Sequence, residues 1–341
     1  MNGGMMKEIS RRRAVVISVL AAFLIIAALV LFFFILPVFT SHRENEESGK
    51  RTLTLYSSLK SAQLEKIESY FERLYPEIDL IFYSSGTGNI IQLLEEANRN
   101  GERGCDVVWC AEPYGYLSLI EKGILAPMDL SSYPDLPLFD AGGGNMMAPA
   151  RLINVGIAVN TTIYDDENAP RSFLDLRECS RLVIPDPYSS GTSLYTVTVL
   201  AKEYGWSYFS DLKENGATVV NGSSASLYAV GTGRYGVTIA PEYLVLSMEA
   251  MGMPLKYIAP SDITVTIPSP LAFVSGCPNP RDAETFISFI LSDSGQAFLY
   301  SIDIMPSRGS YASPGTLLFH IPDEENTISS FDRIFIGQSG R

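Results

Sequence analysis

The sequence is poor in histidine. It has only two in 341 residues, His42 and His320. Both lie far from the hydroxyl-rich turns described below, so these turns have no Ser-His or Cys-His pair and no zinc ligands. No pair of carboxylates stands out as an acid and a base. The sequence therefore predicts a protein that is not an enzyme, with no catalytic residue, no metal site and no cofactor. A hydrolase that uses a serine without a base is disfavoured.

Cysteine is also scarce, and its four positions lack the spacing of a metal site. They are Cys105, Cys110, Cys179 and Cys277. Cys105 and Cys110 flank an expected strand at 106–109, where five extended residues span roughly 16 Å. A disulfide needs Cα atoms within ~7 Å, so these two cannot pair directly. We expect buried free thiols, with a pairing across the fold left open.

Basic residues are outnumbered. The chain has 25 Lys and Arg against 38 Asp and Glu, a net charge of −13. Residues 1–51 hold seven basic and four acidic residues, so the remaining chain carries −16. This balance argues against a nucleic-acid partner. The acidic excess has two interpretations, the solvated surface of a soluble domain or an attraction for a cationic ligand.

One long apolar run is present, from Ala14 to Phe39, after Lys7 and three arginines at 11–13. It exceeds the roughly 7–15 residues of a signal-peptide core and can cross a ~30 Å hydrocarbon layer. We predict a basic cytoplasmic segment at 1–13, a transmembrane anchor at 14–40 and a polar tether at 41–51. A long cleaved signal peptide is the alternative. The positive flank places the rest at the extracytoplasmic face of the cytoplasmic membrane, in the periplasm or at the cell surface.

The most informative segment runs from Leu182 to Leu200. An apolar run at 182–184 is followed by a turn at 185–187, a hydroxyl and glycine cluster at 189–193 and a second apolar run. This order predicts a strand whose tight turn opens a helix with hydroxyls in its first turn. Such a first turn has unpaired N–H groups and the positive end of the helix dipole, so it binds anions well. For one such turn alone, a helix cap is the simpler interpretation.

The same pattern recurs three times, at 57–58, 84–89 and 221–224. The helix after the second of these turns is expected from about Ile90, and a strand at 235–240 follows the third. Ligands of open α/β sheets bind outside the carboxyl ends of the strands. Four such turns therefore indicate a shared binding cleft. Strands that alternate with helices, in a chain that is 46% hydrophobic, predict an α/β fold with two lobes.

The order of motifs resembles one family from end to end. In chain order they are LTLYSSL, YPEIDLIFYSSGTG, CDVVWCAEP, IEKGILAPM, NVGIAVNTTI, PRSFLDL, RLVIPDPYSSGTS, GRYGVTIAPEY and NPRDAETFISFILSDSGQAFL. Over about residues 52–310 they resemble the extracytoplasmic solute-binding proteins of ABC importers, in the ferric-iron, phosphonate and sugar-phosphate branch of the type II class. The resemblance implies a two-lobed α/β fold, periplasmic-binding-protein-like (type II), whose two crossover strands form the hinge and whose lobes close on the ligand. Lobe one would combine 52–152 with 270–341, and lobe two would be 153–269, with hinges near 150–156 and 265–272.

The ligand is harder to predict from the resemblance. Ferric-binding relatives offer adjacent tyrosines where this chain has Glu242 and Tyr243, a thin ligand set for a trivalent cation. The SSGTS turn resembles instead relatives that hold phosphonates or phosphorylated sugars with neutral donors and helix N-termini. We therefore expect a monomer that captures a small anionic solute, a phosphonate, sugar phosphate or similar organophosphate, and delivers it to the transmembrane subunits of an ABC permease. The alternatives are a carrier of ferric iron or an iron chelate, and an anchored sensor for a membrane kinase.

The expected site combines turns of both lobes. Residues 190–193 would hold the phosphate or carboxylate from lobe two, and the turns at 57–58 and 85–87 would close over it. Glu112 would bind an ammonium or sugar hydroxyls, with Glu242 and Tyr243 as second candidates. The predicted ligand-binding residues are Ser57, Ser58, Ser85, Gly86, Thr87, Glu112, Ser190, Gly191, Thr192, Ser193, Ser223, Ser224, Glu242 and Tyr243.

Overall fold

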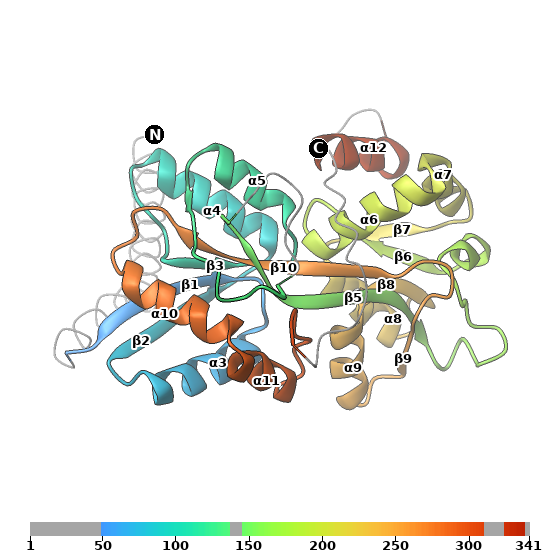
Figure 1. The fold of residues 1–341 in the computed structure, drawn as a ribbon. Helices are drawn as coiled ribbons and strands as arrows, with labels where there is room; N and C mark the ends of the chain where they lie inside the picture. The colour runs from blue at the N-terminus through green and yellow to red at the C-terminus, as the bar shows by residue number, and fades with distance from the viewer. Residues whose placement is uncertain (1–48, 137–144, 310–323, 338–341) are drawn as a thin grey trace, which may run out of the picture. The chain divides into compact units, whose positions relative to one another are not determined.

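A computed structural model describes residues 49–136, 145–309 and 324–337 (Figure 1). The basic segment, the apolar run at 14–40, most of the tether and both histidines lie outside these residues, so the transmembrane anchor stays a prediction. Within the described ranges, no helix is long and apolar enough to span a membrane.

The chain divides into two compact units. Of the described residues, the first contains 49–52 and 76–79, and within it Arg51 N donates to Glu77 O at 2.9 Å. The second contains the other described residues and includes every predicted site residue. The fold described below is that of the second unit.

The first group of elements, called lobe one, alternates strands and helices. Its elements are β1 (Arg51–Ser57), α3 (Ser61–Leu74), β2 (Ile78–Ser84), α4 (Thr87–Arg99), β3 (Val107–Trp109), α5 (Tyr114–Glu121), β4 (Leu125–Ala126), α10 (Pro280–Leu291) and α11 (Asp293–Ser301). In α3, Leu64, Ile67 and Phe71 are buried at helical spacing, so one face packs on the sheet. β1 and β3 pair in parallel, so their carboxyl ends meet at one edge.

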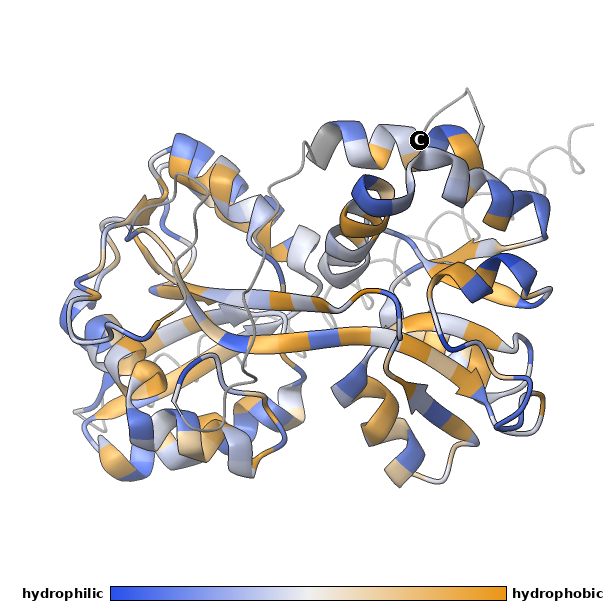
Figure 2. Ribbon diagram, turned by 45° about the vertical axis from the view of Figure 1, so that its right-hand side comes forward, coloured by the Kyte–Doolittle hydropathy of each residue, from blue (hydrophilic) through white to orange (hydrophobic). Residues whose placement is uncertain are grey.

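The second group, called lobe two, repeats this plan. Its elements are η2 (Leu174–Glu178), β6 (Leu182–Pro185), α6 (Gly191–Tyr204), α7 (Trp206–Glu214), β7 (Thr218–Val220), α8 (Ser223–Gly231), β8 (Val237–Pro241), α9 (Glu242–Ala250), β9 (Leu255–Ile258) and α12 (Glu324–Phe335). β6 pairs in parallel with β7 and β8, again bringing strand ends together. The ribbon coloured by hydropathy shows helices whose residues alternate between hydrophobic and hydrophilic, as expected for packing on one face (Figure 2).

Two long strands join the lobes. β5 (Ala148–Asn160) and β10 (Val265–Val274) pair antiparallel from Val155↔Val265 to Ala148↔Leu271 and run side by side in Figure 1. β10 then pairs with β3, and β5 pairs with β8, so both lobes share one ten-stranded sheet. The expected lobe boundaries and hinge positions stay predictions. One difference is that α12, expected with lobe one, packs against α6 and α7, where Phe331 is fully buried.

The element bounds differ from the sequence prediction at several places, and β3 begins at Val107, one residue later than expected. α4 begins at Thr87, three residues before Ile90, because its polar first turn carries no hydrophobic signal; Gly86 precedes it in an extended conformation. β8 begins at Val237, two residues after Tyr235, because the Tyr235 N–H donates to Ala229 O of α8. The four cysteines are free and buried, as expected, and burial raises the pKa of each thiol.

Candidate functional site

A hydroxyl trio, Ser190, Thr192 and Ser223, lies where two helices of lobe two begin. Ser190 Oγ is 2.8 Å from Ser223 Oγ and 3.0 Å from Thr192 Oγ1, and Thr192 Oγ1 is 3.0 Å from Ser223 Oγ. Ser190 also caps α6 by accepting from Ser193 N at 3.3 Å. The trio therefore joins the N-termini of α6 and α8, where helix dipoles favour negative charge.

Two of the five serines and threonines predicted from lobe two lie outside this trio. The Ser193 hydroxyl donates to Pro185 O inside the lobe, so it holds the turn together. Ser224 is the second residue of α8, and its side chain is exposed. The structure therefore brings together three of the five hydroxyls predicted from this lobe.

In lobe one, most of the predicted hydroxyls serve the turns themselves. The Ser57 hydroxyl donates to Trp109 O at 2.7 Å and accepts from Leu59 N at 3.1 Å. Ser85 Oγ accepts from Asn89 Nδ2 at 3.2 Å. Ser58 differs, because its Oγ is buried and has no hydrogen-bond partner in the described chain.

The turns of the two lobes touch one another at Gly191, the first residue of α6. A Cβ on Gly191 would lie 2.5 Å from Glu112 Cγ and 3.1 Å from Thr87 Oγ1, so only glycine fits without a shift. Nearby, the rings of Tyr114 and Tyr195 stack with centroids 5.4 Å apart. The structure is thus a closed state in which the α6 N-terminus meets the turns of lobe one.

A cleft of about 740 Å³ opens beside this contact, between α4, α5 and the turn after β6. Thr87 and Glu112 are the predicted site residues in its lining. Glu112 is only 3% exposed, and its carboxylate accepts from the backbone N–H of Tyr114. Glu95, also in the lining, forms an ion pair with Lys122 at 2.6 Å. The cleft is polar and large enough for a small solute.

Arg151 is a candidate residue that the sequence analysis missed. It lies on β5, is 2% exposed, and its Nε donates to Ser269 Oγ at 3.2 Å. Its Nη2 has no hydrogen-bond partner within the described residues. Burial lowers the pKa of Arg151, and the neighbouring Tyr243 opposes that shift.

A second cation approaches the same tyrosine. Lys60 precedes α3 in lobe one and is partly buried, which lowers its pKa. Its Nζ lies 5.9 Å from the centre of the Tyr243 ring, and Arg151 Cζ lies 5.5 Å from it. Lys60, Arg151 and Tyr243, here called the cationic cluster, thus bring together lobe one, a crossover strand and lobe two.

Glu242 has a different role from its neighbour Tyr243. Its carboxylate accepts from Asn154 Nδ2 at 3.1 Å, and Asn154 Oδ1 accepts from Thr266 Oγ1 at 3.0 Å. This chain of hydrogen bonds ties the start of α9 to both crossover strands. No group of three or more His, Cys, Asp or Glu able to hold a metal occurs in the part of the chain that the structure describes.

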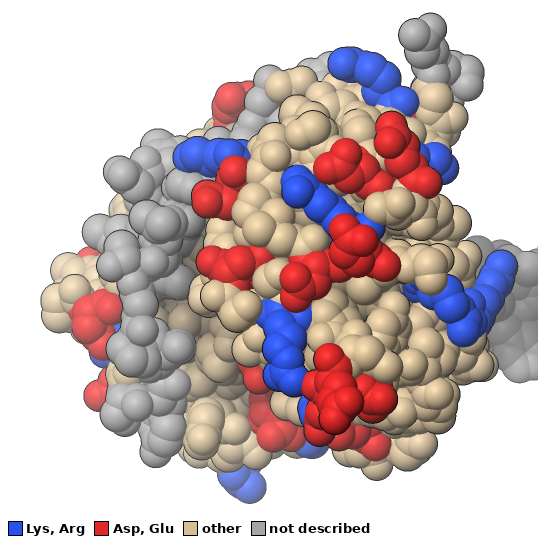
Figure 3. Space-filling view, turned by 90° about the vertical axis from the view of Figure 1, so that its right-hand side faces the viewer, with Lys and Arg blue, Asp and Glu red and all other residues tan. Residues whose placement is uncertain are grey.

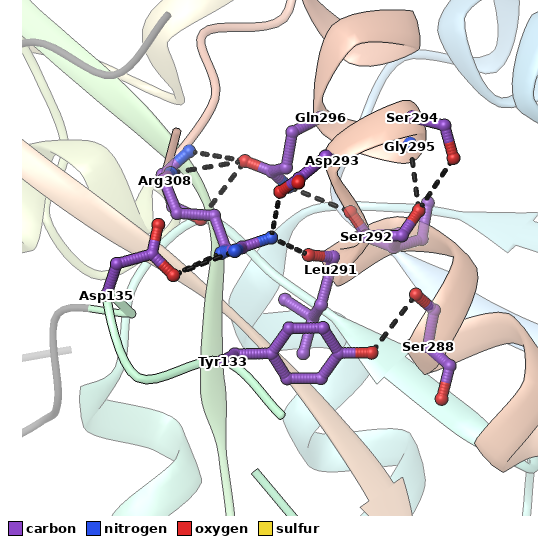
Figure 4. Close-up of polar contacts among 12 residues, drawn as sticks. Tyr133, Asp135, Ser288, Leu291, Ser292, Asp293, Ser294, Gly295, Gln296 and Arg308 are labelled. Atoms are coloured by element: carbon purple, nitrogen blue, oxygen red, sulfur yellow. Dashed lines mark hydrogen bonds and ion pairs between the residues drawn. The ribbon is translucent and has the colours of Figure 1, made fainter. Parts of the chain in front are cut away.

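The strand that carries Arg151 is fixed at its start by Gln296 and Arg308. Gln296 Nε2 donates to Ala150 O at 3.0 Å, and its Oε1 accepts from Arg308 N at 3.3 Å. The Arg308 guanidinium forms ion pairs with Asp135 at 2.8 Å and Asp293 at 2.9 Å, as Figure 4 shows. These contacts, outside the cleft, define the position of Arg151.

The sequence profile of the bacterial extracellular solute-binding proteins matches residues 52–297, most of the chain. The chain belongs to this family. Its members bind small ligands outside the cytoplasm and deliver them to ABC permeases, which confirms the resemblance found in the sequence. They are in general binding proteins without catalytic activity.

Solved structures agree on the fold of this solute-binding protein. Iron-bound HitA from Pseudomonas aeruginosa is 19% identical, with a TM-score of 0.71 over 83% of this chain and 99% of that one. The substrate-binding protein of an ABC transporter from Agrobacterium tumefaciens is 18% identical, with a TM-score of 0.74 over 84% and 94%. AfuA from Actinobacillus pleuropneumoniae, with fructose-6-phosphate bound, is 20% identical, with a TM-score of 0.68 over 84% and 97%. None of the curated proteins matches the sequence.

One signal could have pointed to Arg151 in the sequence of this solute-binding protein. Arg151 is the only charged residue of β5, whose other side chains are almost all buried. A charged side chain inside an apolar strand is rare unless it is paired, so it indicates a candidate binding residue.

Proposed function

We propose that this solute-binding protein captures a small anionic solute between its lobes and delivers it to an ABC permease. The expected solute is a phosphonate, a sugar phosphate or a similar organophosphate. The observation that carries the proposal is the hydroxyl trio, which lies at the N-termini of two helices next to the contact between the lobes. Neutral donors and helix dipoles can hold a phosphate even on an acidic protein, because they act locally.

The acidic surface does not contradict an anionic solute. On the face in Figure 3, acidic side chains lie among basic and uncharged ones, as on an ordinary solvated surface. This face therefore fits the first of the two interpretations of the negative charge, a solvated surface.

Iron is the second candidate, because the family resemblance matches Tyr243 with the tyrosines that ferric-binding relatives offer. Two positive side chains, Lys60 and Arg151, approach its ring at 5.9 and 5.5 Å. They would repel a bare trivalent cation, so an iron complex that carries negative charge is the form of this alternative that fits best.

Membrane attachment completes the proposal. The apolar run at 14–40 would anchor the protein at the extracytoplasmic face, close to the permease. A purified membrane fraction tests this, because an anchored chain stays with the membranes at alkaline pH. Neighbouring genes for a permease and an ATPase would support transport, whereas a neighbouring histidine kinase would favour a sensor.

A thermal-shift panel on the full-length chain tests the solute class. The panel contains hexose phosphates, glycerol phosphate, aminoethylphosphonate, inorganic phosphate and ferric citrate. A solute at ~100 times its Kd adds about 2.7 kcal/mol and raises Tm by a few degrees. We expect this rise with a phosphorylated or phosphonate solute.

The variant Ser223→Ala, with Ser224→Ala as its matched control, links the rise to the trio. Ser223 bonds two hydroxyls, whereas the adjacent Ser224 is exposed on the same helix. We expect Ser223→Ala to weaken binding and Ser224→Ala to leave it unchanged. A response to ferric citrate alone would contradict the proposal.

A further inference from the structure

We propose that the cationic cluster of Lys60, Arg151 and Tyr243, with Ser58, binds the charged end of the solute, and that this end is a doubly charged phosphate or phosphonate. The solute class rests on the proposed function above. The hydroxyl trio keeps the role given to it above. The sequence analysis named neither Arg151 nor Lys60 as a site residue.

The first argument is the unmatched charge of Arg151. Within the described residues, no carboxylate forms an ion pair with Arg151 or with Lys60. Arg308, the comparable buried arginine, forms ion pairs with two aspartates. A buried cation without a counter-ion is unfavourable, so Arg151 is a site at which an incoming anion gains a great deal.

The second argument is that two buried hydrogen-bond donors have no partner in the described chain. Arg151 Nη2 and Ser58 Oγ are both buried without a hydrogen-bond partner in the described chain. Both residues lie next to Cys110: the Ser58 N–H and the Arg151 charge oppose the burial that raises the pKa of its thiol. Buried donors without a partner are favourable positions for the oxygens of a tetrahedral oxyanion.

The hydroxyl trio is different in this respect. Its three hydroxyls bond to one another, and Ser190 also caps α6, so the trio is satisfied without a ligand. A neutral group of this kind discriminates less strongly for charge than a guanidinium, whose hydrogen bonds to phosphate are short and bidentate. We therefore assign the strongest contact with the charged group to Arg151.

The third argument is the origin of the cluster. Lys60 belongs to lobe one, Arg151 to the crossover strand β5 and Tyr243 to lobe two. An anion bound to all three is held only when the lobes are closed. Binding of the charged end would therefore drive closure, because it stabilises the closed state and leaves the open state unchanged.

Two positive side chains indicate the charge of the ligand. Arg151 keeps its charge at any ordinary pH, and Lys60 adds a second one from the opposite lobe. Methylphosphonate and methanesulfonate have nearly the same shape, yet at pH 8 the first is mostly a dianion and the second carries one negative charge. We expect the protein to prefer methylphosphonate.

The test is a titration of the full-length protein with methylphosphonate, methanesulfonate and inorganic phosphate, followed by Tm and by calorimetry. Arg151→Met removes the charge and keeps an unbranched apolar chain in its place. We expect methylphosphonate binding at least about tenfold weaker than in the wild type, with an unliganded Tm equal to or above that of the wild type, since an unpaired buried charge has been removed. Lys60→Gln and Tyr243→Phe should each weaken binding as well.

Arg177→Met is the matched control. Arg177 also lies over a tyrosine ring, 5.2 Å from that of Tyr208, but it pairs with Asp211 and lies in lobe two away from the cluster. The substitution Arg177→Met should leave methylphosphonate affinity unchanged. If Arg151→Met folds poorly, the test of the cluster rests on Lys60→Gln, because Lys60 is only partly buried.

Three outcomes separate the two proposals. In the first outcome, the wild type binds methylphosphonate and the affinity of Arg151→Met or Lys60→Gln stays within about twofold of it. This result overturns the role of the cationic cluster and leaves the proposed function standing. Equal affinity for methanesulfonate overturns the doubly charged ligand. A wild-type protein that binds none of these probes and no larger phosphate overturns the proposed function itself.

Discussion

The ring of Tyr114 in α5 stacks on the ring of Tyr195 in α6, with centroids 5.4 Å apart and planes at 13°. Each side chain is 2% exposed, although the two belong to different lobes. Burial of both rings depends on a closed cleft, since opening would expose two aromatic faces to water. Closure is therefore supported by contacts of the protein itself as well as by the solute.

Tyr114→Leu tests this contact between the lobes. It keeps an apolar side chain but loses the stacked pair, which contributes about 0.5–1.5 kcal/mol beyond its buried area. We expect solute affinity to fall several-fold through a smaller closed population, measured by calorimetry. Tyr228→Leu, at a side chain that is 58% exposed and outside the cleft lining, is the control. Unchanged affinity in Tyr114→Leu would show that the stack does not contribute to closure.

Gly191→Ala should hinder closure in another way. Its new Cβ would lie 2.5 Å from Glu112 Cγ across the contact between the lobes. Gly88→Ala is the matched control, because its Cβ would be 3.5 Å from Tyr188 O, an ordinary contact. Alanine stabilises a helix by roughly 0.5–1 kcal/mol over glycine. We expect Gly88→Ala to raise Tm and keep affinity, and Gly191→Ala to lose affinity. Equal solute affinities in the two variants would contradict this, because they would show that the contact between the lobes shifts to make room for the Cβ.

Arg308→Gln should destabilise lobe one. The guanidinium is only 10% exposed and donates to Leu291 O, Asp135 and Asp293. Losing these contacts should cost about 1–3 kcal/mol of unfolding free energy, measured by denaturant titration. The control is Arg99→Gln, whose side chain is 66% exposed and pairs with Glu96 at 3.8 Å. Exposed pairs of this kind contribute about 0–1 kcal/mol. A loss in Arg308→Gln no larger than that in Arg99→Gln would contradict this role.

Asp262 gives lobe two a pH dependence. Burial raises the pKa of its carboxyl, but hydrogen bonds from the Tyr204 hydroxyl and the backbone N–H groups of Phe173, Leu174 and Ile263 outweigh it, and the net pKa is lowered. A lowered folded-state pKa stabilises the protein above the unfolded value, about 3.9, and this gain is lost as the pH falls through the folded value. Asp262→Asn should therefore be less stable than the wild type at pH 7, with the difference shrinking below about pH 4. A difference independent of pH would contradict this.

Local sequence patterns predict the turns well, because a strand, its hydroxyl-rich turn and the following helix are contiguous. Ser190 at the start of α6 is an example, since its side chain caps the helix that the apolar run after it forms. The family resemblance rests on such segments in a fixed order. The fold class follows from their alternation.

The cationic cluster could not be predicted in this way. Lys60 and Tyr243 lie 91 and 92 residues from Arg151 in the sequence, and only the sheet order brings them together. The hydrogen-bond partner of a single hydroxyl cannot be predicted from the local sequence either, because that partner lies elsewhere in the chain. The Ser57 hydroxyl donates to the Trp109 carbonyl, and the Glu242 carboxylate accepts from Asn154. The Ser58 hydroxyl has no hydrogen-bond partner in the described chain.

Calorimetry of the wild type and of Arg151→Met, with a sugar phosphate and with ferric citrate, tests the central claim most directly. The account predicts binding of the sugar phosphate to the wild type and a loss of at least about tenfold in Arg151→Met. Binding of ferric citrate alone, unchanged in Arg151→Met and lost in Tyr243→Phe, would contradict it and identify an iron carrier.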